Sequence, residues 1–250
     1  MTWLRPMVIF AGLILLWQGV VSVFELPHFI LPGPGLVFVA WSEHFTEIMY
    51  QAQFTLIEIL GGLAAGVALG CSTSLTMAYF APARRWILPV LVISQAIPVF
   101  ALAPILVLWF GYGLASKIAM ATLIIYFPVT SAFFDGLRRT EPGWLDLARV
   151  MGGSRWSVLR HIRVPAALPA LASGLRVATA IAPIGAVVGE WVGSSVGLGH
   201  LMLQSNARTQ TALMFAALLT LVLIAVALYF AVDAALRRAL RWQPESDPTS

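Results

Sequence analysis

Long apolar runs constrain the fold of this chain more than any other feature of its sequence. Sixty per cent of the 250 residues are hydrophobic and only 10% are charged, and the mean hydropathy is +0.88. A soluble domain carries roughly 25% charged residues, so this chain has too few to cover a surface that faces water. In lipid, backbone groups are satisfied within helices. The sequence therefore predicts an all-α membrane protein.

Six runs approach the length of about 20 apolar residues that crosses the hydrocarbon core of a bilayer. They are residues 7–24, 59–80, 86–116, 118–134, 164–189 and 212–232. The third run is too long for one crossing, so we expect an external turn near its end, at the aromatic and glycine residues 109–113. We interpret residues 1–250 as a single transmembrane domain with six transmembrane helices. Its core is about 54–235, its cytoplasmic loop is 136–166, and residues 243–250 form a disordered tail.

The distribution of Lys and Arg predicts the orientation of the spans. If the N-terminus is cytoplasmic, twelve of the 15 basic residues fall inside: Arg5, Arg84, Arg85, Arg138, Arg139, Arg149, Arg155, Arg160, Arg163, Arg237, Arg238 and Arg241. Only Lys117 and Arg208 fall outside, and Arg176 lies within a span, where we expect it to snorkel to the interface. We therefore expect a multi-pass protein of the bacterial cytoplasmic (inner) membrane with both termini cytoplasmic. The net charge of +4 indicates contact with anionic lipid headgroups rather than nucleic acid.

The sequence does not support resident metal, redox or ATP chemistry. Its single cysteine, Cys71, lies in an apolar run, and none of its four histidines is paired with a second ligand at metal spacing. It also lacks the G-x-x-x-x-G-K-[ST] phosphate loop. We therefore expect no enzymatic activity, no catalytic residues, no cofactor and no metal.

Prolines interrupt the third and fourth spans. Pro89, Pro98 and Pro104 lie in the third span and Pro128 in the fourth, and each removes a backbone donor and kinks or breaks a helix. The freed carbonyls need neighbouring groups or a water-filled cavity. The candidate residues of a translocation path are Ser94, Gln95, Pro98, Tyr126, Thr130 and, at the outer mouth, Glu190. For Ser94 and Gln95, hydrogen bonding between helices is an equally open interpretation.

A basic loop with apolar content separates the fourth and fifth spans. Pro142 suits the first position of a helix, and Gly152 with Gly153 can end that helix in the left-handed conformation. Ser154 then caps a second helix, and Pro165 is expected to stop it. We call this helix–glycine turn–helix segment, residues 142–164, the elbow. It projects an apolar knob from a basic surround, and the alternative is an amphipathic hairpin lying on the inner leaflet.

In the elbow the chain resembles a known family. Permease subunits of binding-protein-dependent ABC importers carry a cytoplasmic loop of the form E-A-A-x3-G-x9-I-x-L-P. The residues in register with this pattern are Asp146, Leu147, Ala148, Gly152, Ile162, Val164 and Pro165. Four of these positions are identical to the pattern, the aspartate and the valine are conservative replacements, and Leu147 departs from the usual alanine.

The resemblance implies a type I importer (MetI-like) permease fold in which the elbow docks on a separate ABC ATPase subunit. The implied coupling residues are Asp146, Ala148, Gly152, Gly153, Trp156, Ile162 and Pro165. ATP hydrolysis on that subunit would drive alternating access in the spans. The other implied partners are a periplasmic or lipoprotein solute-binding protein, membrane lipid, and a second permease copy in a homodimer.

The resemblance extends beyond the elbow to the nitrate/sulfonate/taurine (SsuC/TauC-like) class. The similar segments are residues 31–34, 98–104, 109–113, 135–138 and 189–199. Residues 103–113 look most similar to permeases for thiamine-precursor pyrimidines. The implied cargo is such a pyrimidine, an aliphatic sulfonate or a taurine-like solute. Glu58 departs from the basic or neutral residue usual in this class, and we assign it no role.

Two rival functions are considered from the residues. One is an ATPase-independent secondary transporter or channel, which normally needs more spans, internal repeats or paired intramembrane charges. The sequence shows six expected spans, no repeat and few charges within them, which argues against it. The other is a non-transporting membrane assembly factor, which predicts no phenotype that depends on a substrate.

Overall fold

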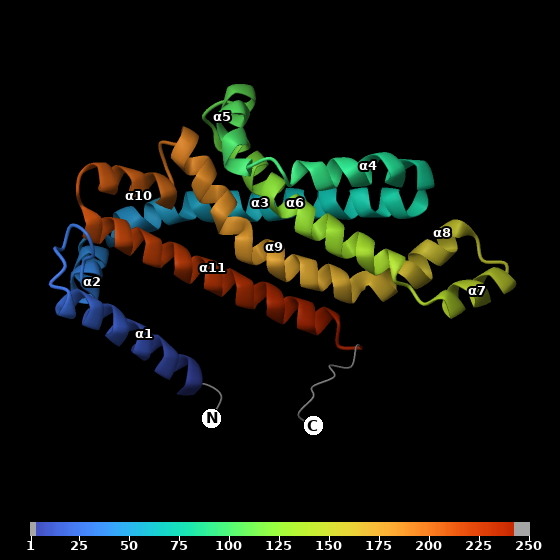
Figure 1. Cartoon of the computed structure of the whole chain (residues 1–250), viewed down its shortest axis with the longest axis horizontal. Coiled ribbons are helices and arrows are strands. Elements are labelled where there is room, and N and C mark those ends of the chain that lie inside the picture. Colours follow the sequence, from blue (N-terminus) through green and yellow to red (C-terminus); the bar gives the residue numbers. More distant parts are fainter. Residues whose placement is uncertain (1–3, 243–250) are drawn as a thin grey trace.

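The computed structural model describes residues 4–242, and every regular element in this part is helical. The predicted tail at 243–250 lies outside the described residues. The long helices are α3 (Phe45–Tyr79), α6 (Leu114–Arg138), α9 (Val164–Gly193) and α11 (Thr211–Ala239). Helix α6 packs against both α3 and α9, and α11 lies along α9 (Figure 1). The prediction of an all-α fold is confirmed.

Shorter helices surround this elongated bundle. They are α1 (Leu4–Val23), α2 (Pro34–Glu43), α4 (Ala81–Ser94), α5 (Val99–Phe110), α7 (Pro142–Val150), α8 (Arg155–Val158) and α10 (Leu198–Ala207). Helices α7 and α8 project at one end of the long axis, and α2 and α10 lie at the opposite end (Figure 1). The molecule therefore has an elbow end and an α10 end.

Four helical segments in the described part are long and apolar enough to cross a membrane. They are Phe45–Tyr79, Leu114–Arg138, Arg155–Gly193 and Thr211–Ala239. Helices α4 and α5 together would supply a fifth crossing, although they bend by 105° at the break between them. The apolar part of α1, Ala11–Val23, is shorter than a full span. The architecture is thus a helical membrane protein with four to five candidate spans, and the sixth stays a prediction.

The break between α4 and α5 is the one that the prolines predicted. Helix α4 ends at Ser94 and Pro98 caps the start of α5, whereas Pro89 and Pro104 stay inside their helices. At the break, the Ala96 N–H donates to the Ile93 carbonyl at 3.0 Å, which is a tightened last turn. Pro128 also remains inside the unbroken α6. Of the four prolines, only Pro98 therefore lies at a break between helices.

Helix α3 begins well before residue 59, where the second apolar run of the sequence starts. Helix α2 ends at Glu43, His44 forms the junction, and residues 45–49 already belong to α3. Ile48 and Ala52 are buried on the same helix as Ile59. Buried residues therefore continue from Ile48 into the predicted span, and packing extends the helix beyond the apolar run.

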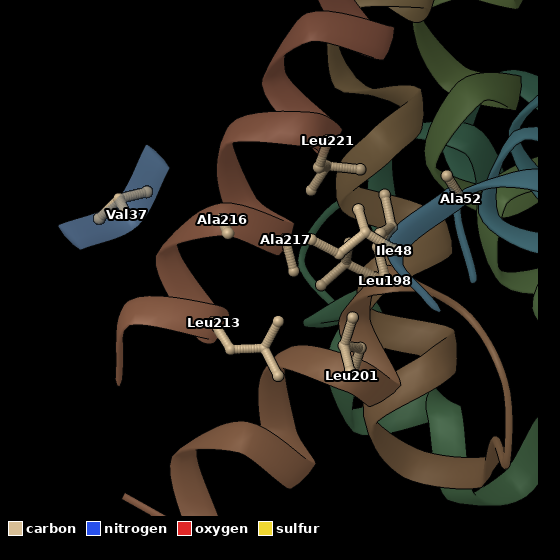
Figure 2. Packing of buried hydrophobic residues seen from close by; sticks show 10 residues of the cluster. Val37, Ile48, Ala52, Leu198, Leu201, Leu213, Ala216, Ala217 and Leu221 are labelled. Carbon is tan, nitrogen blue, oxygen red and sulfur yellow. The ribbon is translucent and has the colours of Figure 1, made fainter. Parts of the chain in front are cut away.

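Apolar packing at the α10 end holds five helices together. The cluster contains Val37 from α2; Ile48 and Ala52 from α3; Val187 from α9; Leu198 and Leu201 from α10; and Leu213, Ala216, Ala217 and Leu221 from α11. Figure 2 shows Leu198 beside Ile48, with Leu213 and Leu201 reaching toward each other from α11 and α10. This contact fixes the α10–α11 hairpin on the start of α3.

Small residues allow α6 to approach its two neighbours closely. A methyl group added at Gly66 of α3 would lie 2.6 Å from the Ile125 Cγ2 atom, and one added at Gly185 of α9 would lie 2.6 Å from the Ala121 Cα atom. Lipid gives helices little hydrophobic reason to associate, so close van der Waals contact between small residues supplies much of the packing. Glycine at 66 and 185 therefore lets α3, α6 and α9 pack as one unit.

Gly185→Ala tests this packing. The new methyl group meets backbone rather than a flexible side-chain tip, so we expect the free energy of unfolding to fall by about 1–3 kcal/mol, measured as a lower melting temperature in detergent. Gly35→Ala in α2 is the matched control, because an added methyl group there meets nothing within 4 Å. Equal melting temperatures for the two variants would contradict the close packing of α6.

Candidate functional site

The elbow has the local structure that its sequence predicts. Pro142 occupies the first turn of α7, and Gly152 ends that helix with a φ of +74°. The Gly153 N–H donates to the Ala148 carbonyl at 2.8 Å, and Ser154 Oγ caps α8 by accepting from the Ser157 N–H at 3.2 Å. The left-handed turn and the serine cap are both confirmed.

Pro165 does not stop the second helix of the elbow, so that expectation was wrong. Helix α8 runs through a π turn, Leu159–Arg163, directly into α9, and Arg155–Gly193 is one continuous helix. In the π turn the Val164 N–H donates to the Leu159 carbonyl. The wider turn accommodates the proline that follows it. The end of the elbow is therefore an extension of a membrane helix rather than a flexible link.

The elbow exposes large apolar side chains. The exposed fractions are 86% for Val150, 78% for Met151, 60% for Leu147 and 58% for Trp156. Large apolar side chains exposed together in one short segment are typical of a surface that contacts another protein or a membrane. Trp156 also packs edge to face on Tyr79 of α3, with ring centroids 6.1 Å apart.

A cavity of about 840 Å³ lies between the elbow and the base of the bundle. Of the predicted coupling residues, Ala148, Gly153, Ile162 and Pro165 line it, together with Trp242 from the far end of the chain. The other three predicted coupling residues are not part of this lining. Asp146 pairs with Arg149 on the exposed side of α7 at 2.8 Å, Gly152 forms the turn, and Trp156 faces α3.

Three of the predicted path residues come together at the proline break. Ser94, Gln95 and Tyr126 line a cavity of about 180 Å³ between α4, α5 and α6. None of the described residues that line it is charged. The Tyr126 hydroxyl also donates to Thr73 Oγ1 at 3.0 Å, and the Ser94 hydroxyl to the Leu91 carbonyl at 2.7 Å. The serine bonds within its own helix rather than to a neighbouring one.

The remaining predicted path residues lie elsewhere. Thr130 is fully buried and donates to the Tyr126 carbonyl at 2.6 Å, so it lies behind the cavity wall. Pro98 forms the break without lining the cavity. Glu190 is 1% exposed. Its expected place at an open mouth is thus wrong for this chain, because protein encloses its carboxylate.

Glu190 belongs to a buried polar cluster at the α10 end. Thr55 Oγ1 donates to Glu190 Oε1 at 2.6 Å, and the Gly199 N–H donates to Glu190 Oε2. The Leu198 N–H donates to Thr55 Oγ1 at 2.8 Å. The first N–H groups of a helix lack partners within it and attract negative charge. A carboxylate from α9 and a hydroxyl from α3 thus anchor the start of α10.

A second pair of charges lies beside this cluster. Lys117 Nζ lies 3.4 Å from Glu58 Oε1, and the two side chains are 4% and 0% exposed. The sequence placed Lys117 in an external segment and assigned Glu58 no role. Both residues were missed because their helices meet only in the folded protein. The sequence offered one signal, namely that Glu58 and Lys117 each lie beside an apolar run. An ionisable residue in such a place suggests a functional site.

A third ionic group joins α9 to α11 nearer the elbow end. Arg176 Nε lies 2.8 Å from Asp233 Oδ1, and Arg237 contacts the other oxygen of the same carboxylate. Arg176 therefore has a protein partner, and the expectation that it simply snorkels was wrong. These pairs also remove one sequence argument against a secondary transporter, namely the scarcity of paired intramembrane charges. Other evidence must therefore decide between an ABC importer permease and a secondary transporter.

Comparison with known families supplies that evidence. The family model described as "Binding-protein-dependent transport system inner membrane component" matches residues 62–241, which is well over half of the chain. The chain belongs to this family. The permease is therefore a subunit of an ABC importer and a multi-pass inner-membrane protein, and it is not itself an enzyme. It works with an ATPase and a solute-binding protein.

Three similar proteins align with most of the permease. It is 53% identical to a probable ABC transporter permease protein of Haemophilus influenzae, over 94% of this chain and 96% of the relative. It is 37% identical to the riboflavin transport system permease protein RibX of Chloroflexus aurantiacus, over 92% and 87%. It is 38% identical to the formylaminopyrimidine transport permease protein ThiX of Halalkalibacterium halodurans, over 79% of each chain.

A solved structure has the same fold. A chain of the MetNI methionine ABC transporter, in an inward-facing conformation, aligns with a TM-score of 0.62 and covers 84% of this chain and 99% of that one. The identity is 22%, so the likeness concerns the fold. The MetI-like arrangement that the elbow sequence implied is therefore confirmed at the level of fold, while the number of spans is not.

Lys117→Met tests the buried ion pair. Removing one partner of a buried pair leaves an uncompensated charge, so we expect the free energy of unfolding to fall by about 3–5 kcal/mol. The double variant Glu58→Gln with Lys117→Met removes both charges and should recover most of this loss, as measured by thermal melting in detergent. A double variant as unstable as Lys117→Met would show that the pair does not carry the effect.

Proposed function

We propose that the permease imports a small uncharged nitrogen heterocycle, of the pyrimidine class, and is driven by an ATPase that grips the elbow. In this proposal the elbow and both termini face the cytoplasm, and six spans cross the membrane. The solute-binding protein delivers the cargo at the α10 end. The observation that carries the choice of cargo is the uncharged cavity at the proline break.

The lining of that cavity supports an uncharged solute over a sulfonate. Ser94, Gln95 and Tyr126 offer hydrogen-bonding groups on an otherwise apolar wall, which is the usual composition of a site for a small organic molecule. The sulfonate group of an aliphatic sulfonate or of taurine is permanently ionised, and taurine carries an ammonium group as well. Buried charged groups need paired or hydrogen-bonded partners. The names of the riboflavin and formylaminopyrimidine relatives support the same choice, since both describe nitrogen heterocycles.

The exposed face of the elbow supports docking on the ATPase. An amphipathic helix that seats its apolar face in a groove needs large anchors with charged residues at the rim. Trp156, Met151 and Val150 supply exposed anchors, and Arg149 and Arg155 lie beside them. The alternative, a hairpin lying on the inner leaflet, is less favoured because α8 continues into α9 and moves with it.

The broken span supports pairing with a second copy of the permease. Helices α4 and α5 leave large apolar side chains uncovered, with Leu108 81% exposed, Trp109 72% and Ile93 64%. The cavity of about 180 Å³ is lined by other residues of the same two helices, of the break between them and of α6. We propose that two copies meet across α4 and α5, so that the proline breaks of both line one path.

Gly152→Val tests the coupling role. A β-branched residue is strained at a φ of +74°, whereas Gly143, in the same elbow, has room for a side chain and an ordinary φ. We expect Gly152→Val to reduce uptake in proteoliposomes by at least about tenfold, since strain of roughly 1–3 kcal/mol reshapes the turn. Gly143→Val should retain uptake, and membrane insertion should be normal in both. Normal uptake by Gly152→Val would refute coupling through this turn.

Gln95→Leu tests the path. The importer, reconstituted with its ATPase and binding protein, is given a labelled formylaminopyrimidine and, separately, taurine. A hydrogen bond between uncharged groups contributes roughly 0.5–1.5 kcal/mol, so we expect about two- to tenfold slower pyrimidine uptake with unchanged affinity of the binding protein. Gln210→Leu, at an exposed turn before α11, is the control. Import of taurine in preference to the pyrimidine would overturn the proposed cargo.

A further inference from the structure

A single arginine joins three helices where the elbow enters the bundle. The guanidinium of Arg163, the last residue of the π turn, donates from Nε and Nη2 to the Leu137 carbonyl at 3.1 and 2.8 Å. Its Nη1 donates to the Ala78 carbonyl at 3.4 Å. Leu137 lies in the last turn of α6 and Ala78 in the last turn of α3. The side chain thus connects the start of α9 to the ends of α3 and α6.

Both accepting carbonyls are groups that their own helices leave without a backbone donor. The last four carbonyls of a helix have no partner within it. The residue four positions after Ala78 is Pro82, which has no N–H to offer. Helix α6 ends at Arg138, and the other donor to the Leu137 carbonyl is the Thr140 hydroxyl at 3.3 Å. A cation at the C-termini of two helices is also favoured by their dipoles.

Apolar packing makes this junction rigid. Leu159, at the start of the same π turn, is 3% exposed and packs in one cluster with Phe133 and Leu137 of α6. Leu75 and Ala78 of α3 pack against the same cluster. The carbonyl contacts of Arg163 therefore lie at the edge of a packed core that contains parts of three helices. Because α8 and α9 form one continuous helix, a displacement of α8 reaches this junction directly.

We propose that Arg163 is a positioning residue that makes α3 and α6 follow the elbow when the ATPase moves it. The proposal rests on the coupling role of the elbow proposed above. Arg163 lies away from the cavity at the proline break, so it acts through the helices that it joins. Without the guanidinium, the elbow still docks and the ATPase still turns over. The ends of α3 and α6 then follow α9 less closely, because only the apolar contacts of the junction still connect them.

The test compares Arg163→Met, Arg163→Lys and Arg160→Met in the complete importer in proteoliposomes. Substrate uptake and ATP hydrolysis are measured together, and the ratio of solute moved to ATP hydrolysed is the readout. Arg160 is the matched control because it lies in the same π turn with an exposed side chain. Co-purification of the ATPase and the melting temperature are recorded for each variant.

We expect Arg163→Met to lower the ratio by at least about fivefold, since hydrogen bonds from a charged donor are the strong ones, while ATP hydrolysis and co-purification persist. Arg163→Lys should recover part of the ratio, because an ammonium group keeps the charge and loses the planar fork. Arg160→Met should match the unmodified importer. If the methionine variant fails to insert, Arg163→Gln is measured in its place with the same expectation.

Two results would overturn the proposal. One is an unchanged ratio in Arg163→Met, even with a lower melting temperature, because the arginine would then act on stability alone. The other is loss of the ATPase from Arg163→Met, because the side chain would then belong to the docking surface. Gly152→Val separates this proposal from the one on which it rests. If Gly152→Val alone impairs transport, coupling through the elbow stands and only the role of Arg163 falls.

Discussion

In lipid there is no water to hydrogen-bond with backbone N–H and C=O groups, so these groups need partners within the protein. The ends of the helices show how the permease supplies such partners. At the α10 end, the first N–H groups of α10 donate to Thr55 of α3 and Glu190 of α9. At the elbow end, the last carbonyls of α3 and α6 accept from Arg163. Each contact satisfies a backbone group that its own helix leaves unpaired. The same contacts join different helices, so satisfying the backbone also assembles the bundle.

Between these two ends, close packing and a local break have different consequences. The glycines of α3 and α9 let α6 lie against both neighbours, which leaves little freedom for one of the three to move alone. The break before Pro98 is the opposite case, because it exposes apolar side chains and forms the cavity lined by Gln95 and Tyr126. In the proposed import cycle, the closely packed helices would move as one body, and the broken helix beside them is where the direction of the chain can change.

Much of the fold and of the elbow follows from local sequence. The proline break, the left-handed turn at Gly152 and the serine cap at Ser154 each depend on the properties of one or two residues, and each was predicted. The errors were of another kind. The helix continues through Pro165 because a π turn precedes it, and Glu190 is enclosed because α3 and α10 close around it. Neighbours distant in sequence decided both outcomes.

The sequence by itself determined the membrane environment, the helical class and the family, because hydropathy, proline and glycine positions and the spacing of the elbow residues are local properties. The tertiary structure alone decided which polar side chains meet. Glu58 pairs with Lys117, Arg176 with Asp233, and Arg163 with two carbonyls. These pairings depend on which faces of the helices come into contact. Packing between segments far apart in the sequence sets those faces, as the small residues along α3, α6 and α9 do for the central helices.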